Sequence, residues 1–237
     1  MFFFLIDSMI LFLIFVILLF SLYEIKYNEK DFGSINSLKF YIYFVVVCLL
    51  LVFYGILKFR FAMNINFLRG VCFFNSFYIV NDLIIFGKCF ILIITIICLL
   101  LSYNYFKVER AFFIEYIVFI LLAIISIFFF LSANDFFIAY LSIEMQAFCF
   151  YIIFSLVKYN NISLEASLKY FILSVFASAI LLFGISFIYG SCGTLKFFEI
   201  SLILFENNSN VLNLYVLGLF FFFFGILFKL ALVPFHY

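Results

Sequence analysis

The chain has 237 residues, of which 70% are hydrophobic and only 11% charged, and its formal net charge at pH 7 is +1. A water-soluble fold could not cover so much apolar surface, so this composition predicts an all-α protein that crosses the membrane several times. The balanced charge supplies no positive field, which excludes nucleic acid as a partner and leaves lipid as the surroundings.

The sequence offers few ligands for a metal. Its one histidine is His236, which excludes a haem held by paired imidazoles and argues against copper and zinc sites. The six cysteines lack the short paired spacing of metal or redox sites, so we expect them to pack as small hydrophobic residues. We therefore predict no metal and no cofactor in this chain. The 44 phenylalanines and the absence of tryptophan are typical of an AT-rich gene, as in organelle genomes.

The N-terminal part of the chain predicts three membrane helices. Three apolar runs are each long enough to span a membrane, at 2–23, 40–57 and 83–103. The first of them is predicted to be a retained helix and not a signal peptide. Residues 71–80 are apolar but too short to span, which favours a surface hairpin or a half-inserted segment. Lys88 lies within the first two turns of the third helix, and we expect its amine to reach the membrane surface.

The central stretch places a carboxylate inside a span. Residues 112–131 predict the fourth helix, a polar break follows, and 136–157 predict the fifth helix, which contains Glu144. About ten residues at roughly 1.5 Å each bring Glu144 about 15 Å along this helix, near the midplane of a hydrocarbon layer about 30 Å thick. An ionised group is costly there unless it is paired or hydrated, so Glu144 is a functional candidate. The alternative is a neutral, hydrogen-bonded carboxyl that only packs two helices together.

The sixth helix is predicted to begin near Leu164, because Ser163 can cap its free amides. Lys169 follows Glu165 by four residues, which allows either an ion pair on one helix face or a role in proton transfer. Residues 190–210 are polar and contain glycine, so they predict a loop. A small-residue surface on the sixth helix predicts close approach by another helix, and it is formed by Ser174, Ala177, Ser178, Ala179 and Gly184.

The last predicted helix, 211–233, contains Lys229 and meets Pro234, which removes an amide donor and kinks or ends the helix. If 211–233 is the whole span, Lys229 lies near the membrane surface. If Pro234 breaks the helix within the membrane, Lys229 is buried and available for proton chemistry. Tyrosines near the span ends, Tyr140 among them, are expected to form the interfacial belt in place of tryptophan.

Three segments resemble a known family. The junction of the fourth and fifth helices in the antiporter-like subunits of respiratory complex I is similar to LSANDFFIAYLSIEMQAFCFYII (131–153). NADH dehydrogenase subunit 2 resembles the chain more closely still in LEASLKYFILSVFASAILLFGISFIYGSCGTL (164–195) and FGILFKLALVPFHY (224–237). The motifs fall in order at the family's spacing.

The resemblance implies an incomplete antiporter-like inverted-repeat fold of about seven transmembrane helices, with a last helix that is broken at Pro234 and His236. It implies a proton relay in which Glu144 lies on the fifth helix, Lys169 on the sixth and Lys229 on the seventh. It also implies two parts. Residues 1–110 form three helices with the hairpin, and residues 111–237 form an incomplete first antiporter-like repeat of four helices.

The implied function is proton translocation by the membrane arm of NADH:ubiquinone oxidoreductase (complex I), in a multi-pass protein of the mitochondrial inner membrane that is encoded in the mitochondrion. An anionic Glu144 near a lysine favours the protonated lysine, and their separation drives the proton along a hydrated path. This chain then needs no redox centre. The flavin, the iron–sulfur clusters and the quinone are expected in partner subunits of this H+-translocating enzyme.

The resemblance also predicts partners. In this family the Pro-Phe-His segment lies near the middle of the subunit, whereas this sequence stops at Tyr237. We therefore expect a second polypeptide to supply the C-terminal half of a split subunit 2, beside other membrane-arm subunits and lipids. A truncated chain that acts as a scaffold is the alternative. Two other functions stay open: a subunit of a multi-subunit cation/proton antiporter, and a structural membrane protein with vestigial charges.

Overall fold

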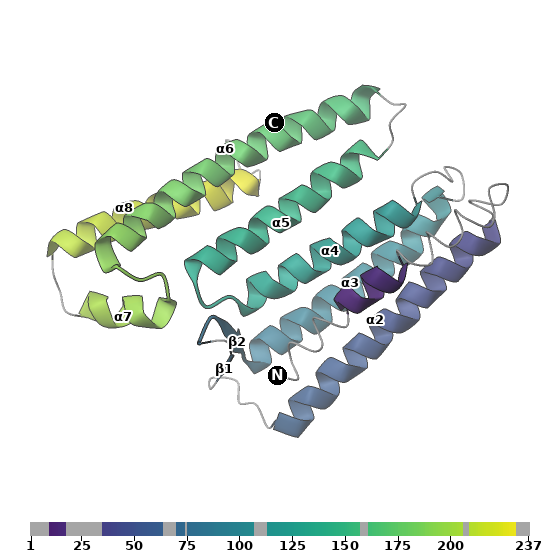
Figure 1. The fold of residues 1–237 in the computed structure, drawn as a ribbon, viewed down its shortest axis with the longest axis horizontal. Coiled ribbons are helices and arrows are strands. Elements are labelled where there is room, and N and C mark those ends of the chain that lie inside the picture. The colour runs from purple at the N-terminus through teal and green to yellow at the C-terminus, as the bar shows by residue number, and fades with distance from the viewer. Residues whose placement is uncertain are drawn as a thin grey trace. The chain divides into compact units, whose positions relative to one another are not determined.

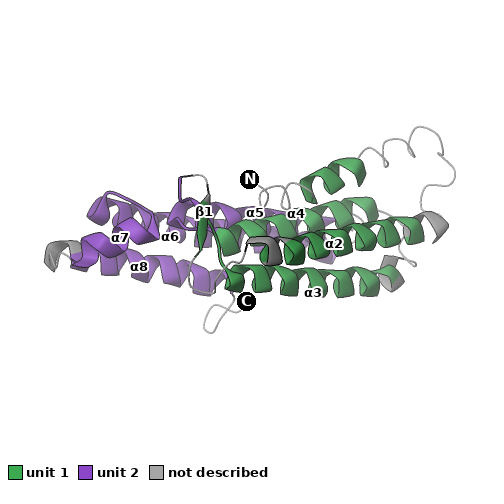
Figure 2. Ribbon diagram, turned by 90° about the horizontal axis from the view of Figure 1, so that it is seen from below, with its two compact units in different colours: residues 1–73, 79–132 green, residues 74–78, 133–237 purple. Residues whose placement is uncertain are grey.

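The fold consists of membrane-length helices in two compact units. The computed structural model describes residues 10–17, 35–63, 70–73, 75–106, 113–156, 161–205 and 209–230. Unit 1 contains Met1–Phe73 and Ile79–Ser132, and unit 2 contains Phe74–Tyr78 and Ala133–Tyr237 (Figure 2). Among the described residues, six helices are long and apolar enough to cross a membrane. This confirms the predicted all-α, polytopic architecture of about seven helices, the first of which lies mostly outside the described residues.

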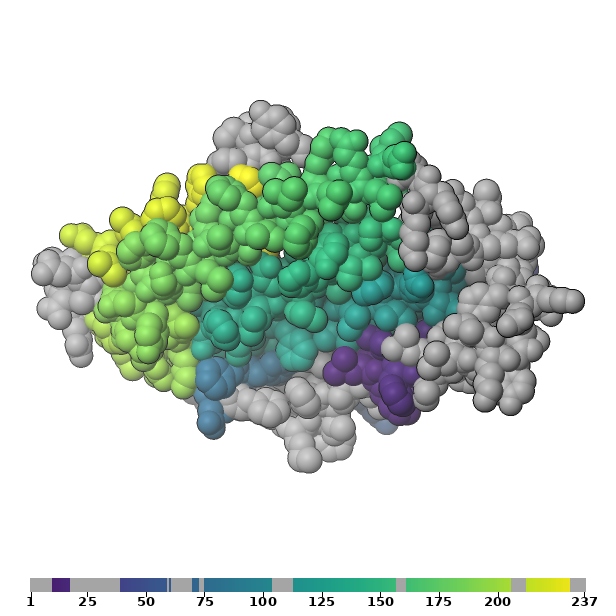
Figure 3. Space-filling model, turned by 45° about the horizontal axis from the view of Figure 1, so that its top comes forward, coloured from purple at the N-terminus to yellow at the C-terminus, as the bar shows by residue number. Residues whose placement is uncertain are grey.

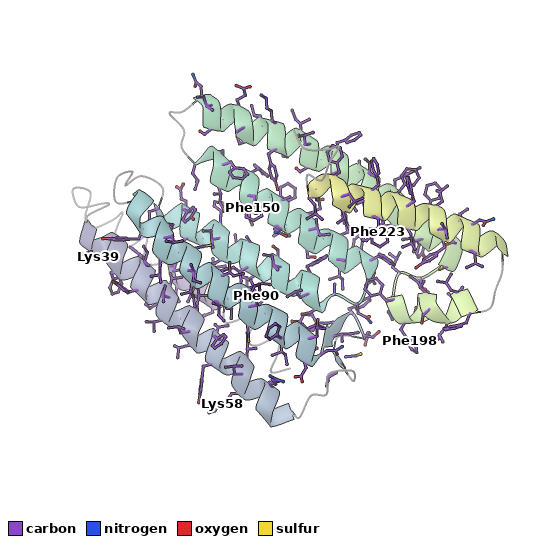
Figure 4. The ribbon with its side chains drawn as sticks, turned by 180° about the vertical axis from the view of Figure 1, so that it is seen from behind. Lys39, Lys58, Phe90, Phe150, Phe198 and Phe223 are labelled. Carbon is purple, nitrogen blue, oxygen red and sulfur yellow. The ribbon has the colours of Figure 1, made fainter. Side chains whose placement is uncertain are left out.

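Three long helices form most of unit 1, and α3 packs against both others (Figure 1). They are α2 (Ile35–Met63), α3 (Asp82–Phe106) and α4 (Phe113–Ser132). Each is apolar on all sides, as expected of helices whose backbone polar groups must be satisfied within lipid. Lys39 and Lys58 bound the 20-residue span of α2 and lie at its two ends in Figure 4. At about 1.5 Å per residue, this span matches a hydrocarbon layer about 30 Å thick.

A short hairpin precedes α3. Strands β1 (Val71–Phe73) and β2 (Tyr78–Val80) pair in a two-stranded sheet, so the apolar segment that is too short to span is a hairpin. Its turn contains Asn75 and Ser76 at φ 53° and 68°, a left-handed conformation that asparagine tolerates better than most residues. The turn is held by Asn134, whose side-chain amide donates to the Ser76 carbonyl at 2.7 Å.

The described residues of unit 2 form four helices, and α6 packs against both α5 and α8 (Figure 1). The α5 helix begins after Asp135, whose Oδ1 accepts a hydrogen bond from the Phe137 amide at 2.9 Å. That carboxylate satisfies one of the free amides of the first turn and lies at its positive end. The four helices are α5 (Phe136–Ser155), α6 (Asn161–Cys192), α7 (Phe197–Phe205) and α8 (Ser209–Lys229).

Two predictions about this part of the chain are wrong in detail. The α6 helix begins at Asn161, so Ser163 lies inside it and does not cap it. The predicted loop at 190–210 holds the end of α6 and the whole of α7. The α6 helix ends where Gly193 adopts φ 69°, and the Gly193 amide donates back to the Tyr189 carbonyl at 2.7 Å. Nine mostly apolar residues then form α7, which is too short to be recognised as a membrane-spanning run.

Glycines bring the backbones of α6 and α8 into contact. A Cβ on Gly184 would lie 2.6 Å from the Phe222 nitrogen and 2.8 Å from the Gly218 oxygen, so a side chain there would collide with backbone atoms. This confirms close helix approach at the small-residue surface, where Ala177 is buried as well. Ala179 is exposed and takes no part. Figure 3 shows the atoms of α8 (yellow) against those of α6 (green).

Two predicted features stay predictions. The division into 1–110 and 111–237 follows a repeat boundary, whereas the two compact units follow spatial contacts and separate at Ser132 and Ala133. The helix break at Pro234 and His236 lies outside the described residues.

Candidate functional site

The α5 and α8 helices bring two opposite charges together. The Lys229 amine donates a hydrogen bond to Glu144 Oε1 at 2.5 Å, although the two residues are 85 positions apart in the chain. Both side chains are largely buried, at 13% and 15% exposure. Glu144 is the ninth of the 20 residues of α5, so it lies about 12 Å from the helix start at 1.5 Å per residue. An ion pair therefore forms near the middle of a membrane-spanning helix.

Of the two predicted positions for Lys229, near the membrane surface or buried, the structure has the buried one. It is the last residue of α8, and its amine turns toward Glu144 instead of extending to the membrane surface. The α6 helix contacts both α5 and α8 and so holds the two charged helices in register. Gly225, one turn before Lys229, allows α8 to approach Leu181 and Ala177 of α6. The small residues of α6 thus contribute to the site without contacting the charges.

Two tyrosines lie in the neighbourhood of the carboxylate. Tyr140 precedes Glu144 by one helical turn, which places both on one face of α5. Its phenol lies near the hydroxyl of Ser178, a buried residue of α6 that donates a hydrogen bond to the Val175 carbonyl at 2.7 Å. Tyr140 and Tyr170 both lie close enough to Glu144 to experience its charge. Hydroxyls both donate and accept hydrogen bonds, which is the property that a proton path needs.

Sequence reasoning missed this role for Tyr140 and assigned the residue to the interfacial belt. The structure instead turns its phenol toward α6, where it meets Ser178. The four-residue spacing between Tyr140 and Glu144 was a signal that the two share a helix face. The position of Ser178 in the small-residue surface was a second signal, because that surface faces the neighbouring helices.

Lys169 is not brought to the buried pair. Its amine lies 2.6 Å from Glu165 Oε1, and the two side chains are 70% and 66% exposed. This is the i,i+4 ion pair that the spacing allowed. A role for Lys169 in proton transfer therefore stays a prediction.

Lys88 contradicts its prediction. Its side chain is 0% exposed and does not extend to the membrane surface. The amine instead lies 4.9 Å from the centroid of the Phe128 ring, on the neighbouring α4. The lysine stem is long enough for either arrangement, and the packing of α4 against α3 decides between them. Lys88 and Phe128 both belong to unit 1.

The described residues contain no cluster of three or more histidine, cysteine, aspartate or glutamate side chains that could hold a metal ion. The six cysteines, all within the described part of the chain, are free thiols. A carboxylate and an amine in contact, such as Glu144 and Lys229, can exchange a proton.

Comparison with known proteins gives consistent results. Residues 133–237, which make up most of unit 2, match the family profile described as "NADH:quinone oxidoreductase/Mrp antiporter, TM". NADH-ubiquinone oxidoreductase chain 2 of Oenothera berteroana is 38% identical over 166 residues, which are 69% of this chain and 34% of the relative. NADH-quinone oxidoreductase subunit N 1 of Thermodesulfovibrio yellowstonii is 41% identical over 163 residues, 69% of this chain and 35% of the relative.

A solved structure shares the fold. Respiratory complex I from Thermus thermophilus with bound aureothin contains a chain that superposes with a TM-score of 0.70 and 19% identity, over 98% of this chain and 45% of that one. The aligned part of this chain spans about a third of the length of the curated relatives it matches. Residues 133–237 therefore carry the transmembrane domain of NADH:quinone oxidoreductases and Mrp antiporters, and the chain is a relative of chain 2 and subunit N of the NADH–quinone oxidoreductases.

Proposed function

We propose that this chain is a proton-translocating membrane-arm subunit of an NADH:ubiquinone oxidoreductase, respiratory complex I. One observation carries the proposal: a buried glutamate and a buried lysine form an ion pair between two membrane-spanning helices, with 2.5 Å between Glu144 Oε1 and Lys229 Nζ. Charged groups inside a membrane are costly and mark ion or proton pathways. The similarity to chain 2 and subunit N gives the reaction to which such a pathway belongs.

The proposed mechanism is electrostatic. While Glu144 is anionic and close, it stabilises the ammonium form of Lys229. When a change elsewhere in the complex separates the two groups, the ammonium loses this partner and releases its proton to a hydrated path. Moving one charge through about 100 mV of membrane potential corresponds to about 2.3 kcal/mol, which is comparable to the strength of a hydrogen bond between charged groups.

Hydroxyl groups extend the proposed pathway. Tyr140, one helical turn from Glu144 and near Ser178, would deliver protons to Glu144 or receive them. Lys169 keeps its proposed place in the relay at the start of α6, where its exposed side chain is open to water or to a neighbouring subunit. The helix break at Pro234 and His236 is part of the same proposal, because a broken helix can expose Lys229 to water within the membrane.

The proposal extends to the surroundings of the chain. Other membrane-arm subunits and lipids would be its neighbours, and the flavin, iron–sulfur clusters and quinone would lie in partner subunits. We also propose the mitochondrial inner membrane as its location. The phenylalanine-rich composition and the similarity to a plant chain named for ubiquinone support this location.

A second polypeptide with the C-terminal half of subunit 2 is a further part of the proposal. The matched part is about a third of the length of the relatives. Mass spectrometry of the purified complex should find peptides that match the remainder of subunit 2 on a separate chain. Peptides that join that remainder covalently to this sequence, or its complete absence, would contradict a split subunit.

The test of the function is NADH-driven proton pumping by the complete complex in sealed vesicles. We expect Glu144→Gln and Lys229→Ala each to lower proton uptake at least tenfold, because each removes one charge of the pair. Glu199→Gln and Lys196→Ala are matched controls, since they break a second glutamate–lysine pair that lies outside the membrane spans. The amount of assembled complex is measured for every variant.

The same experiment separates the alternatives. Unchanged pumping by assembled Glu144→Gln and Lys229→Ala complexes would contradict the proposal and favour a structural membrane protein with vestigial charges. The family profile also covers Mrp antiporters, which keeps a cation/proton antiporter subunit as a second candidate. Loss of sodium efflux in these variants, with NADH-driven pumping intact, would favour that candidate.

A further inference from the structure

The short helix α7 presents apolar side chains on two opposite sides. Toward the bundle, Ile200 is buried in a core cluster that includes Ile188 of α6. On the other side, Phe198, Leu202 and Phe205 are 68%, 53% and 82% exposed. Their spacing of four and then three residues places them on one helix face, which we call the outer face of α7. An apolar stripe is therefore left at the surface after the inner side of α7 has packed on the bundle.

The start of α7 lies at one end of a membrane span. The ring of Phe197, its first residue, contacts the ring of Phe136, the first residue of α5, with 4.8 Å between the centroids. The span Phe136–Ser155 has 20 residues, or about 30 Å at 1.5 Å per residue, which matches the hydrocarbon layer. The first residue of α5 therefore marks a boundary between hydrocarbon and headgroups. Main-chain hydrogen bonds hold α7 there, because the Phe197 amide donates to the Asn134 carbonyl at 3.2 Å.

The length and charge of α7 suit a helix that lies along this boundary. Its nine residues extend about 14 Å, roughly half of what a crossing needs. The Lys196 amine lies 3.2 Å from Glu199 Oε1, and the Ser201 hydroxyl donates to the Phe198 carbonyl of its own helix at 2.6 Å. The two opposite charges leave 196–205 without a formal net charge. The apolar outer face, and not attraction between charges, therefore determines what α7 binds.

The surface beside α7 is of the kind that faces lipid. Figure 1 shows α7 beside the end of α6 and the start of α8. Tyr189 in the last turn of α6 is 57% exposed, and Leu214 near the start of α8 is 42% exposed. Phe198 lies on the side of α7 away from α8 (Figure 4). The outer face thus continues the apolar surface of two membrane-spanning helices, and exposed apolar patches at this level are typical of membrane contact.

We propose that α7 is an in-plane membrane anchor, whose outer face binds the acyl chains of phospholipids just below their headgroups. The contact holds the connection between α6 and α8 at the membrane surface. Because Phe197 packs on the first residue of α5, it also fixes the depth of the helix that carries Glu144. This inference goes beyond the proposed function, since it assigns a lipid-binding surface that proton transfer does not require.

A tryptophan reporter tests the depth of the outer face. The full chain contains no tryptophan, so one substitution gives a unique fluorescent group. Phe198→Trp and Phe205→Trp place it on the outer face of α7. Phe90→Trp is the matched control, at a side chain that is 57% exposed and well inside the span Asp82–Tyr103. The purified full chain is reconstituted in phosphatidylcholine vesicles that carry a nitroxide on the acyl chain, either close to the headgroup (shallow) or near the bilayer centre (deep).

We expect the shallow nitroxide to quench both α7 reporters about twofold more than the deep one, and the reverse order for Phe90→Trp. Stronger quenching of the α7 reporters by aqueous iodide than by either nitroxide would place the outer face in water and overturn the proposal. Stronger quenching by the deep nitroxide would place α7 inside the hydrocarbon, which would also overturn it.

Labelling of the unmodified complete complex tests whether another polypeptide covers the outer face. A diazirine probe dissolved in the bilayer attaches, on illumination, to side chains that face lipid. Mass spectrometry should find the label on Phe198, Leu202 or Phe205 and not on the buried Ile200. If all three lack it in a complex whose spans are labelled, for example at Phe90, a neighbouring subunit occupies the outer face and the proposal is wrong. Neither readout depends on proton pumping, so this inference and the proposed function can fail independently.

Discussion

Each unit of the protein buries a lysine in its membrane helices, but the two units surround the charge differently. In unit 2 the Lys229 amine meets a carboxylate at 2.5 Å, on a side chain that keeps 13% exposure. In unit 1 the Lys88 amine meets the face of an aromatic ring at 4.9 Å, on a side chain with none. The first contact joins two titratable groups, and the second joins a titratable group to an aromatic ring.

This difference shows how one kind of side chain can serve two purposes in lipid. A carboxylate holds the proton of a lysine strongly and makes its release depend on moving the partner away. A ring attracts the ammonium more weakly and from a broad range of angles. The proton on Lys229 should therefore respond to a helix or side-chain movement that separates its amine from Glu144.

Breaking the pair in unit 2 should have the largest effect on stability. Removal of one partner of a buried ion pair leaves an uncompensated charge and costs about 3–5 kcal/mol. We expect Glu144→Gln alone to reduce the thermal stability of the purified complex more than Glu144→Gln combined with Lys229→Met, which leaves no unpaired charge. Thermal unfolding of the wild-type complex, the single variant and the double variant checks this order. A double variant less stable than the single one would mean that the pair is not the source of the loss.

Glycine-to-alanine substitutions should have the next largest effect on stability, and the effect should differ between the two units. Gly184→Ala forces a methyl group against backbone atoms of α8, so we expect a loss of about 1–3 kcal/mol, as for overpacked cores. Gly87→Ala in unit 1 meets only the end of the Leu131 side chain at 3.3 Å and should change stability by less than about 1 kcal/mol. The yield of folded protein after heating measures both. Equal losses would contradict the difference in packing.

The first turns of α5 and α3 provide a smaller contrast. Asp135→Ala removes the capping carboxylate of α5 and should cost about 1 kcal/mol. Asp82→Ala breaks the ion pair with the half-exposed Arg60 at the start of α3 and should cost between about 0 and 1 kcal/mol. Hydrogen exchange at the amides of each first turn would report these losses. Faster exchange at the α3 start than at the α5 start would reverse the expected order.

The smallest effect on stability is expected at the exposed pair on α6. Lys169→Gln removes one partner of an ion pair that is open to solvent, so the amount of assembled complex should not change measurably. Pumping by the same preparation tests the relay. A fall in proton uptake with intact assembly would support the proposed role of Lys169, and wild-type uptake would reduce the residue to its ion pair with Glu165.

The spans and the central carboxylate could be predicted because both are local patterns. About 20 apolar residues define a span wherever they occur, and Glu144 stands out inside one. The pairing of Glu144 with Lys229 depends on contacts far apart in sequence, and the resemblance to a family supplied what residue patterns left open. The end of α6 and the start of α7 were missed because the glycines and polar residues of 190–210 are typical of a loop, although only 193–196 separate the two helices.

The burial of Lys88 could not be predicted from its own helix. Its stem can reach the membrane surface or turn inward, and the outcome depends on Gly87 and on the Phe128 ring of α4. The prediction for Tyr140 was incomplete for a similar reason, since its neighbour Ser178 lies on another helix. In both cases the sequence placed the residue near a span end, and the neighbouring helix decided where the polar group points.

The contact between Gly184 and Gly218 limits how the buried pair can open. Because only glycine fits at this close approach of the two backbones, sliding α8 along α6 would bring larger side chains into the contact, so we expect the two helices to move together. Gly225 extends that contact to within one turn of Lys229. Separation from Glu144 is then left to a swing of the four-carbon lysine arm or to a tilt of α5. A side chain changes rotamer in about nanoseconds, and a helix tilts in about microseconds to milliseconds. The kind of movement therefore determines how fast the Glu144–Lys229 pair can open.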